Sequence, residues 1–361
     1  MLLTKTEVQR YEQSVGKAVA WLRQNAEKII ATKDVSAHYK APYLYAATGE
    51  RIYARKHMDV IVKRYLQRDG DFRTHPRHPG WPQEPAGPGN RYVYTDSWLI
   101  VGLQRMGVYG AANKALQFVR RFQDPVLGGF RSRFDPATGH MDRRYLDASS
   151  TSVAGLALLA CGQISDARRA GEFILRLLES QADWKRYYFT SWDAKQGLMT
   201  DVFADENPGA LRGRSQFCVS AVSDVAREPI WMIGIAMTFL SKLADATGDP
   251  RFLKGAKKLF NFFHRMDEGR WKNLSACKIM WGSAEVYRLT GETKYAQTAK
   301  RILDWLRDCQ YQWGGWLHTV RFDKPEDQPF GATADIIFEL GGEIKETVFN
   351  LSGNSARKKI K

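Results

Sequence analysis

The sequence predicts an all-α fold, an (α/α)6 toroid in which six helical hairpins close into a ring. The first observation is a repeated phrase, a glycine turn followed by the start of an amphipathic helix. It recurs along the 361-residue chain at Gly49, Gly107, Gly162, Gly248 and Gly291. The second is an alternation of two kinds of helix-period run, six with a charged face and six rich in Ala, Gly, Ser and Trp. Six outer and six inner helices in strict alternation can bury an inner ring without capping repeats.

The runs with a charged face are predicted to be the outer helices, because each has one apolar side for the core and one polar side for water. They cover residues 4–31, 50–68, 110–123, 164–180, 250–267 and 292–309. The runs between them are predicted to be the inner helices. They cover residues 38–48, 94–107, 145–161, 226–246, 272–290 and 331–350.

One domain over residues 1–361 is expected, because no Pro/Ser/Gly-rich linker and no charge run divides the chain. The largest interruption of the repeat is the segment 181–225. It has β-like runs at 187–192 and 217–222 around a Gly/Pro/Arg-rich middle, which predicts a short β-hairpin-like insertion. This insertion could serve either as a lid or as an interface.

The chain is basic, with 54 Lys and Arg against 39 Asp and Glu, a net charge of +15. Such a charge raises the local concentration of an anionic small-molecule substrate, although a solvated basic surface is an equal reading. Nucleic acid is disfavoured as a partner, since no helix-turn-helix, RNP, KH or zinc-finger pattern is present.

No apolar stretch of about 18 residues and no basic-then-apolar leader is found, so a cytoplasmic enzyme without a membrane partner is expected. A homo-oligomer is left open. The four cysteines stand apart, with no CxxC pair, so neither a disulfide framework nor a cysteine-based metal site is predicted, and no cofactor is expected.

The connections between helices are asymmetric. Links from inner to outer helices are tight glycine turns, whereas links from outer to inner helices are long, at 69–93, 124–144, 181–225 and 310–330. Long loops on one rim usually carry function. The inner helices begin at that same rim, where free backbone N–H groups favour a negative group. We therefore expect the functional site at this rim.

The leading catalytic candidates are Asp96 and Asp147, each near the start of a predicted inner helix. One reading is that each aspartate merely caps its helix. The functional reading is that both converge on one cavity, where like charge and burial keep one carboxyl protonated as an acid while the other acts as a base. Glu228 and His38 are further catalytic candidates. Glu228 precedes Pro229 and could simply complement a helix dipole, and His38 could cap a turn.

Further rim residues are candidates for binding substrate, as hydrogen-bonding groups or as aromatic platforms, with core packing as the alternative for the tryptophans. They are Tyr39, Lys40, Tyr94, Trp98, Arg144, Tyr145, Trp231, Lys278, Trp316, His318 and Asp335.

The helix starts TGDPRFLKGAKKLFNFF and TGETKYAQTAKRILDWL, with GGF at 128–130 and GGW at 314–316, resemble the six-hairpin toroid superfamily. Its members include unsaturated glucuronyl and rhamnogalacturonyl hydrolases, N-acylglucosamine 2-epimerases and, more distantly, terpenoid cyclases and protein prenyltransferases. Resemblance to the uronyl hydrolases implies that Asp96 and Asp147 are the pair acting on the C4=C5 double bond of an unsaturated sugar. The epimerases use histidines within inner helices, and here only His38 lies on such a run.

The Gln310…Gly314…Trp316 spacing matches the Q-x3-G-x-W repeat of triterpene cyclases, but the sequence has neither a DxDD nor a DDxxD motif. The expected function is therefore metal-free acid–base chemistry on an anionic or polyhydroxylated small substrate, with hydrolysis or hydration of an unsaturated uronide as the leading version. The alternatives are a cyclase or isomerase of a terpenoid or polyketide, which predicts an aromatic and aliphatic cavity, and a non-catalytic binding toroid, which predicts that the two aspartates face apart.

Overall fold

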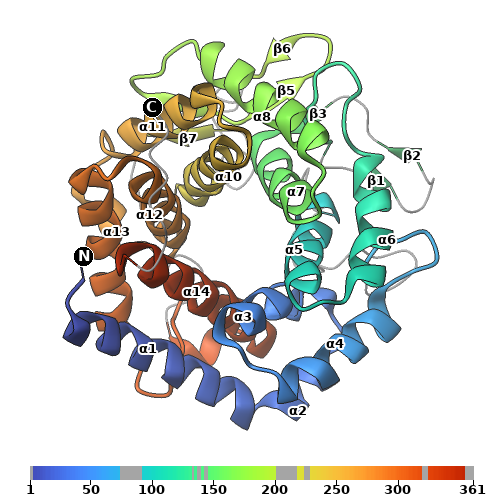
Figure 1. The fold of residues 1–361 in the computed structure, drawn as a ribbon, viewed down its shortest axis with the longest axis vertical. Helices are drawn as coiled ribbons and strands as arrows, with labels where there is room; N and C mark the ends of the chain where they lie inside the picture. Colours follow the sequence, from blue (N-terminus) through green and yellow to red (C-terminus); the bar gives the residue numbers. More distant parts are fainter. Residues whose placement is uncertain are drawn as a thin grey trace.

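A computed structural model describes residues 3–73, 92–131, 134–135, 140–141, 145–200, 218–222, 228–318 and 324–353. Within these residues, six helices form an inner ring in which each packs on the next and the last packs on the first (Figure 1). They are α3 (Ala41–Thr48), α5 (Tyr92–Arg105), α7 (Ala148–Ala160), α10 (Trp231–Thr247), α12 (Cys277–Thr290) and α14 (Phe330–Leu351).

A second layer of helices surrounds this ring. They are α1 (Lys5–Gln24), α4 (Ile52–Tyr65), α6 (Tyr109–Arg120), α8 (Ile164–Glu179), α11 (Pro250–Phe263) and α13 (Thr293–Asp308). The short helix α2 (Ala26–Ala31) continues α1 after a break at Asn25. The predicted toroid of alternating inner and outer helices is confirmed, because every predicted run contains the helix assigned to it within a few residues.

Tight turns join each inner helix to the outer helix that follows. Gly49, Gly248 and Gly291 end α3, α10 and α12 in the left-handed region, at φ of 72°, 70° and 72°. This is the conformation that glycine adopts without steric cost. In α11 the start is also fixed, since Asp249 accepts a hydrogen bond from the Arg251 amide and Pro250 occupies the first helical position.

Small residues let the inner helices approach closely. A Cβ placed on Gly234 of α10 would lie 2.2 Å from the carbonyl carbon of Lys278 in α12, and one on Gly102 of α5 would lie 2.6 Å from the amide nitrogen of Tyr43 in α3. Any larger side chain at these positions would push the helices apart. The Ala/Gly-rich composition of the inner runs is therefore a requirement of ring closure.

Three glycines, each in the loop after an outer helix, pack against the backbone of the next outer helix, and we call each of these contacts a clamp. Gly70, Gly128 and Gly314 have positive φ, and a Cβ on each would lie within 2.5 Å of a backbone oxygen in α6, α8 or α1, respectively. At the third clamp, Gln310 donates from Nε2 to the carbonyl oxygens of Ser14 (3.0 Å) and Gly314 (2.8 Å). The Q-x3-G-x-W spacing in this chain is thus architectural, since it joins the loop after α13 to α1.

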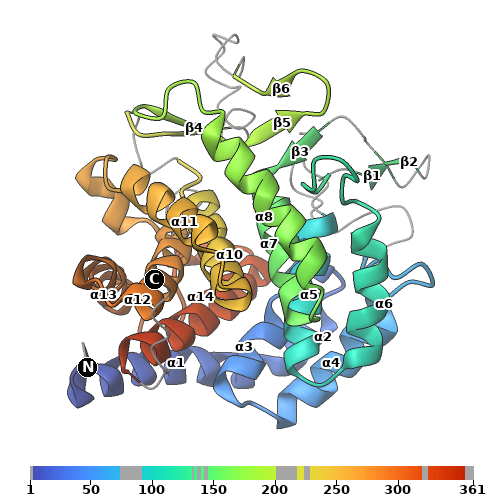
Figure 2. The same ribbon diagram turned by 45° about the horizontal axis from the view of Figure 1, so that its top comes forward.

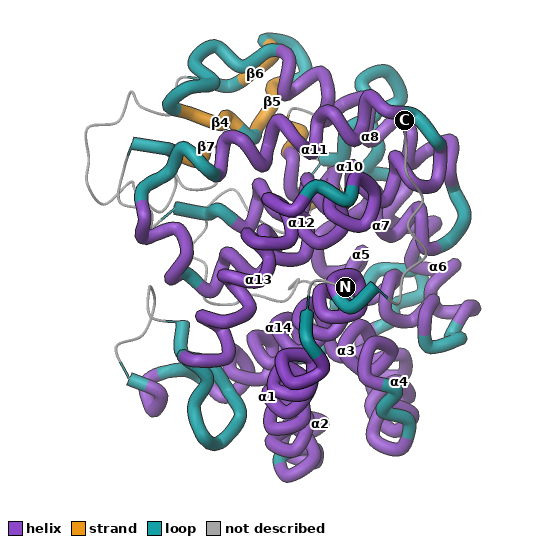
Figure 3. The backbone as a smooth tube through the Cα atoms, turned by 60° about the vertical axis from the view of Figure 1, so that its left-hand side comes forward, coloured by secondary structure: helices purple, strands orange, loops and turns teal. Residues whose placement is uncertain are grey.

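Strands gather at the end of the ring where the inner helices begin (Figures 2 and 3). β4 (Tyr187–Phe189) pairs antiparallel with β7 (Cys218–Ser220), which confirms the predicted β-like insertion. β3 (Tyr145–Asp147), β5 (Ser191–Asp193) and β6 (Gly197–Leu198) form a second small sheet, and β3 leads directly into α7. A third pair joins β1 (Phe134–Asp135) to β2 (His140–Met141).

In the described connections there are four 3-10 turns: η1 (Val35–Ala37), η5 (Glu268–Lys272), η6 (Leu274–Ala276) and η7 (Pro325–Asp327). The turn η6 explains why α12 begins later than predicted. Before α12, the side chain of Asn273 accepts a hydrogen bond from the Ser275 amide, which favours a tight turn over α-helix. None of the helices in the described ranges is long and apolar enough to span a bilayer.

Candidate functional site

Five charged side chains, four from the inner helices α12 and α14 and one from the residue before α3, meet inside the ring. We name them the lysine–carboxylate cluster: Lys40, Lys278, Asp335, Glu339 and Glu343. Lys40 directly precedes α3, and Lys278 is the second residue of α12. The three carboxylates follow one another at intervals of four residues along α14, so they share one face of that helix.

Glu339 is the centre of the cluster. Its carboxylate contacts the ammonium of Lys278, and its Oε2 atom lies 2.6 Å from Nζ of Lys40. Lys40 also pairs with Oδ2 of Asp335 at 3.0 Å, and Lys278 pairs with Oε1 of Glu343 at 2.9 Å. Two ammonium groups therefore bridge three carboxylates in an unbroken chain.

Solvent reaches two of the three carboxylates of the cluster but not the third. The side chains of Asp335 and Glu339 are 12% and 18% exposed, whereas that of Glu343, one turn deeper, is fully buried. Asp335 lies near the beginning of α14, at the rim with the long loops. A solute entering from that rim would meet Asp335 and Glu339 first.

The lysines of the cluster are held in the charged form. Burial lowers the pKa of Lys40, but the carboxylate of Asp335 together with the Tyr39 and Tyr94 hydroxyls outweighs it, and the net pKa lies well above that of an ordinary lysine. Burial likewise opposes charge on Lys278, and Glu343 again raises its pKa above the ordinary value. Both side chains are therefore hydrogen-bond donors and positive charges rather than nucleophilic amines.

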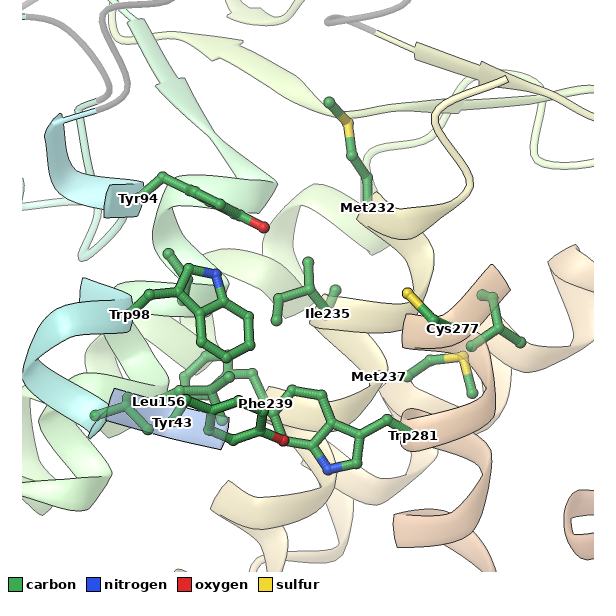
Figure 4. Close-up of a cluster of buried hydrophobic side chains, with 14 of the residues drawn as sticks. Tyr43, Tyr94, Trp98, Leu156, Met232, Ile235, Met237, Phe239, Cys277 and Trp281 are labelled. Carbon is green, nitrogen blue, oxygen red and sulfur yellow. The ribbon is translucent and has the colours of Figure 1, made fainter. Parts of the chain in front are cut away.

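Aromatic side chains, of which Tyr94 and Trp98 are labelled in Figure 4, form a wall beside the cluster. The Nζ atom of Lys278 lies 5.2 Å from the ring centroid of Trp98, within reach of a cation–π contact. Tyr94 lies one turn before Trp98 and packs edge-on against Trp231 at 5.6 Å. The indole N–H of Trp98 is buried without a hydrogen-bond partner in the described part of the chain, and Figure 4 shows it on the same side as the Tyr94 hydroxyl. It is a donor available to a bound molecule.

Tyr39 completes this end of the site. Its hydroxyl lies 3.5 Å from Oδ2 of Asp335, and its ring is 6.3 Å from that of Tyr94. Burial and the nearby Asp335 carboxylate raise the pKa of Tyr39, so its phenol stays protonated. The structure thus brings together Tyr39, Lys40, Tyr94, Trp98, Trp231, Lys278 and Asp335, all predicted from the sequence to bind substrate.

Asp96 does not join this site. It lies two residues from both Tyr94 and Trp98, which places it on the opposite side of α5. There its Oδ1 atom accepts a hydrogen bond from the Phe72 amide at 3.2 Å. It is the fifth residue of α5, so the helix-cap reading is also wrong.

Asp71 shares the buried position of Asp96. Burial raises the pKa of Asp71 to about 6, although its ion pair with Arg73, at 3.0 Å, opposes the shift. Burial and the Asp71 charge raise the pKa of Asp96 well above the ordinary range. The carboxyl that shares a buried position with Asp96 is therefore that of Asp71 and not that of Asp147, and the pKa of each member of this pair is raised.

Asp147 caps α7, as the simpler reading predicted. Its Oδ1 atom accepts hydrogen bonds from the Ser150 amide at 2.7 Å and the Ser149 hydroxyl at 2.6 Å. Its other oxygen, Oδ2, is buried and has no hydrogen-bond partner among the described residues. One carboxylate oxygen of Asp147 therefore takes no part in the helix cap.

His38 lies outside the cluster, against the expectation that it would sit on an inner helix and face the cavity. It follows η1, where Nε2 donates to the Thr32 carbonyl at 2.9 Å and Nδ1 lies 2.7 Å from Nε2 of His57. His57 in turn is hydrogen-bonded to the Tyr45 hydroxyl. Burial lowers the pKa of His38 to about 4, and it also lowers the pKa of His57. The two imidazoles are therefore neutral, and their hydrogen bonds serve the packing of the core.

Trp316 is also structural. It is fully buried, and its indole N–H donates to the Leu306 carbonyl of α13 at 2.8 Å, which leaves it no face for substrate. Glu228 accepts a hydrogen bond from the Ser220 amide and so connects β7 to the start of α10. His318 is fixed through its backbone amide by Gln328, and Tyr145 is half-buried in β3. Arg144 lies outside the described residues.

Sequence reasoning missed Glu339, Glu343 and Asp71. The signal for the first two was available, since carboxylates four residues apart on an otherwise apolar and glycine-rich inner run must share a buried face. Asp71 gave no such signal, because only the folding of its loop onto α5 places it beside Asp96.

The Cys277 thiol lies beside the same glutamates, and potential ligand atoms of Cys277, Glu339 and Glu343 lie within 4.8 Å of one another. Lys278 contacts both of these carboxylates. A metal ion there would have to displace that ammonium, so the cluster fits an organic substrate better.

Comparison with protein-family models gives no match, and comparison with curated proteins finds no relative by sequence. Solved structures with the same fold are found. D-Mannose isomerase matches with a TM-score of 0.68 at 10% identity, over 95% of this chain and 97% of that one. An unsaturated glucuronyl hydrolase specific for heparin matches with a TM-score of 0.59 at 9% identity, over 97% and 99%.

A type II terpene cyclase from Scytonema, in complex with its substrate geranylgeranyl dihydroxybenzoate, matches with a TM-score of 0.55 at 11% identity, over 97% and 99%. At these identities the likeness shows a common fold. The three neighbours are all enzymes, and they place this chain in the architecture of the six-hairpin toroids.

Proposed function

We propose that this protein is an acid–base enzyme that acts on a sugar or a related polyhydroxylated small molecule, and that the lysine–carboxylate cluster does the chemistry without needing a metal. The observation that carries the proposal is the position of Glu339. This carboxylate contacts the ammonium groups of Lys40 and Lys278 and is partly exposed to solvent. The ring of Trp98 lies beside the same cluster.

The two walls of the site match the two faces of a sugar ring. A sugar presents C–H groups, which pack on an aromatic ring, and hydroxyls, which need donors and acceptors. Trp98 and Tyr94 offer the aromatic surface, while the cluster offers both ammonium donors and carboxylate acceptors. An apolar polyene would cover the same aromatic wall but leave the charged wall without hydrogen bonds to water. This contrast favours a sugar over a terpenoid.

The cluster suits proton transfer beside a carbonyl group. Glu339 would take the proton from the carbon next to the carbonyl of an open-chain sugar. The ammonium of Lys278 or Lys40 would donate a hydrogen bond to the carbonyl oxygen, on which negative charge develops. For isomerisation, the proton of the adjacent hydroxyl also passes to the former carbonyl oxygen, which gives an enediol, and return of the first proton to the former carbonyl carbon gives the isomeric ketose or aldose. Return of the first proton to the opposite face of the carbon it left gives the epimer. D-Mannose isomerase, by its name, interconverts sugars on this fold.

Hydration of an unsaturated uronide is the second candidate, supported by the free Oδ2 atom of Asp147 at the rim. The ammonium groups of the cluster would then bind the uronate carboxylate, and Asp147 would protonate the double bond. The second carboxylate expected for this reaction is missing from the site, because Asp96 lies on the side of α5 away from Tyr94 and Trp98.

The test is incubation in D2O with a panel of aldoses and ketoses, followed by NMR for deuterium at the carbon beside the carbonyl, together with an assay for loss of the uronide double bond. Glu339→Gln should reduce deuterium incorporation at least 100-fold, the usual scale for a general base. Glu346→Gln is the matched control, since Glu346 lies on the same helix, pairs with Arg105 and Lys242, and has a similarly exposed side chain. It should leave the rate within a factor of two to three.

Loss of activity only in Asp147→Asn, with uronides as the sole converted substrates, would replace the first reaction with the second. Saturable sugar binding without any conversion would indicate a binding toroid. Conversion that survives Glu339→Gln unchanged would overturn the role of the cluster.

A further inference from the structure

A pocket lies at the end of the ring opposite to the rim that bears the lysine–carboxylate cluster. It has a volume of 410 Å³ and is lined by residues from the later turns of α5, α7 and α10, from α12 and from the start of α6. We name it the far-end pocket: Val101, Gln104, Arg105, Tyr109, Leu156, Leu159, Ala160, Lys242 and Trp281. None of these residues belongs to the lysine–carboxylate cluster.

Two polar atoms of the far-end pocket lack partners. Trp281 is 1% exposed, and its indole N–H is buried without a hydrogen-bond partner among the described residues. Figure 4 shows this nitrogen on the side of the aromatic cluster away from Met232 and Tyr94. The Oε1 atom of Gln104 is also buried and unpartnered within the described chain. Leaving a buried donor and a buried acceptor unpaired is costly, so a ligand that reached either atom and bonded to it would recover part of that cost.

The charges of the far-end pocket are already neutralised. Arg105 pairs with Glu346, and Lys242 pairs with Glu285 at 2.6 Å and with Glu346 at 3.7 Å. An anionic ligand would have to compete with these carboxylates. The remaining wall is aliphatic, from Leu156, Leu159 and neighbouring residues, and Tyr109 stands 57% exposed among the lining residues.

We infer that the far-end pocket is a second binding site, for a neutral, ring-containing small molecule that carries a hydroxyl group. A hydroxyl can accept from the indole N–H of Trp281 or donate to Oε1 of Gln104, so either unpaired atom gives it a partner. The apolar ring packs on the aliphatic wall. The volume is within the usual range of small-molecule sites, about 300–1,000 Å³. This site is independent of the function proposed above.

The test uses 2-naphthol as a fluorescent probe and 2-methylnaphthalene as its analogue without a hydroxyl. Ala160→Phe, on the last residue of α7, fills the far-end pocket. Ala47→Phe is the matched control, because Ala47 is also a half-buried alanine near the end of an inner helix but lines a different hollow. Wild type and Ala47→Phe should bind 2-naphthol saturably, and Ala160→Phe should bind it at least tenfold more weakly.

Gln104→Leu removes the acceptor for the ligand hydroxyl but keeps a side chain of similar size in the wall of the pocket. It should weaken 2-naphthol binding at least fivefold and leave 2-methylnaphthalene binding unchanged, with circular dichroism confirming that each variant is folded. Absence of saturable binding by the wild type, equal affinity of wild type and Ala160→Phe, or an equal affinity of wild type for the two probes would each overturn the inference.

Discussion

The indole rings of Trp98 and Trp281 lie 6.0 Å apart at an interplanar angle of 33°, and their N–H groups point toward opposite ends of the toroid (Figure 4). Both N–H groups are buried without partners among the described residues. One ring belongs to the wall of the lysine–carboxylate cluster, and the other lines the far-end pocket. Substitutions of the two tryptophans should therefore affect two different binding sites.

Trp98→Phe should raise KM for the sugar substrate about fivefold, because a lost hydrogen bond to a bound hydroxyl is worth roughly 1 kcal/mol. kcat should change little, since the indole N–H does not take part in proton transfer. Trp281→Phe is the control and should leave KM unchanged. Steady-state kinetics of the two variants check this, and an equal effect of both substitutions would contradict it.

Asp96→Asn should stabilise the protein at high pH. In the wild type, the pKa of Asp71 is raised to about 6 by burial and that of Asp96 is raised further, so the folded state binds protons that the unfolded state releases above about pH 4. Wild-type stability should therefore fall as the pH rises through these values. Asparagine keeps the acceptor for the Phe72 amide and does not ionise.

Urea unfolding at pH 4.5 and pH 8 measures this difference. The variant should gain about 2 kcal/mol relative to wild type between the two pH values, on the scale of 1.36 kcal/mol per pKa unit. Activity should persist. A variant of unaltered stability that has lost activity would restore Asp96 to the catalytic role that the sequence suggested.

His38→Gln should cost stability at pH 7.5, where the neutral imidazole completes the chain from Thr32 to His57. Burial lowers the pKa of His38 to about 4, so the unfolded state takes up a proton below its own pKa near 6.5 that the folded state refuses. Wild-type stability is therefore lost as the pH falls from about 6.5 toward 4. Glutamine does not titrate, so the gap between variant and wild type should narrow by about 2 kcal/mol at pH 4.5. A gap independent of pH would refute the neutral pair.

Gly314→Ala should be far more damaging than Gly49→Ala. Both glycines have positive φ, which costs an alanine about 1 kcal/mol. At Gly49 a Cβ would meet nothing within 4 Å, whereas at Gly314 it would lie 2.4 Å from the carbonyl oxygen of Lys17. The second substitution must therefore displace α1 or the loop, and we expect a loss of at least about 3 kcal/mol. Thermal unfolding of the pair measures this, and equal losses would show that the loop yields without cost.

Sequence periodicity was enough to predict the ring, because glycine turns and the alternation of charged and small-residue runs are local signals. The residues of the site were partly predictable for the same reason. Lys40, Lys278 and Asp335 stand near the starts of inner helices and meet at one rim. Pairings across the layers could not be predicted, since they depend on how a loop folds back. Two examples are Asp71 beside Asp96, where a loop lies against the outward side of α5, and His38 beside His57, where the turn before α3 lies against the outer helix α4.

The clamp that joins Gly314 to α1 has a consequence for folding. Tyr11 bonds Asp304 and Ser14 bonds Gln310, so the first outer helix is held by residues almost 300 positions later in the chain. During synthesis, the apolar side of α1 stays uncovered until α13 and α14 have been made, because it packs against these two helices. We expect the seam between the first and last hairpins to be the slowest part to assemble and the earliest to open. A nascent chain halted before this seam closes would offer chaperones and proteases an open arc rather than a ring.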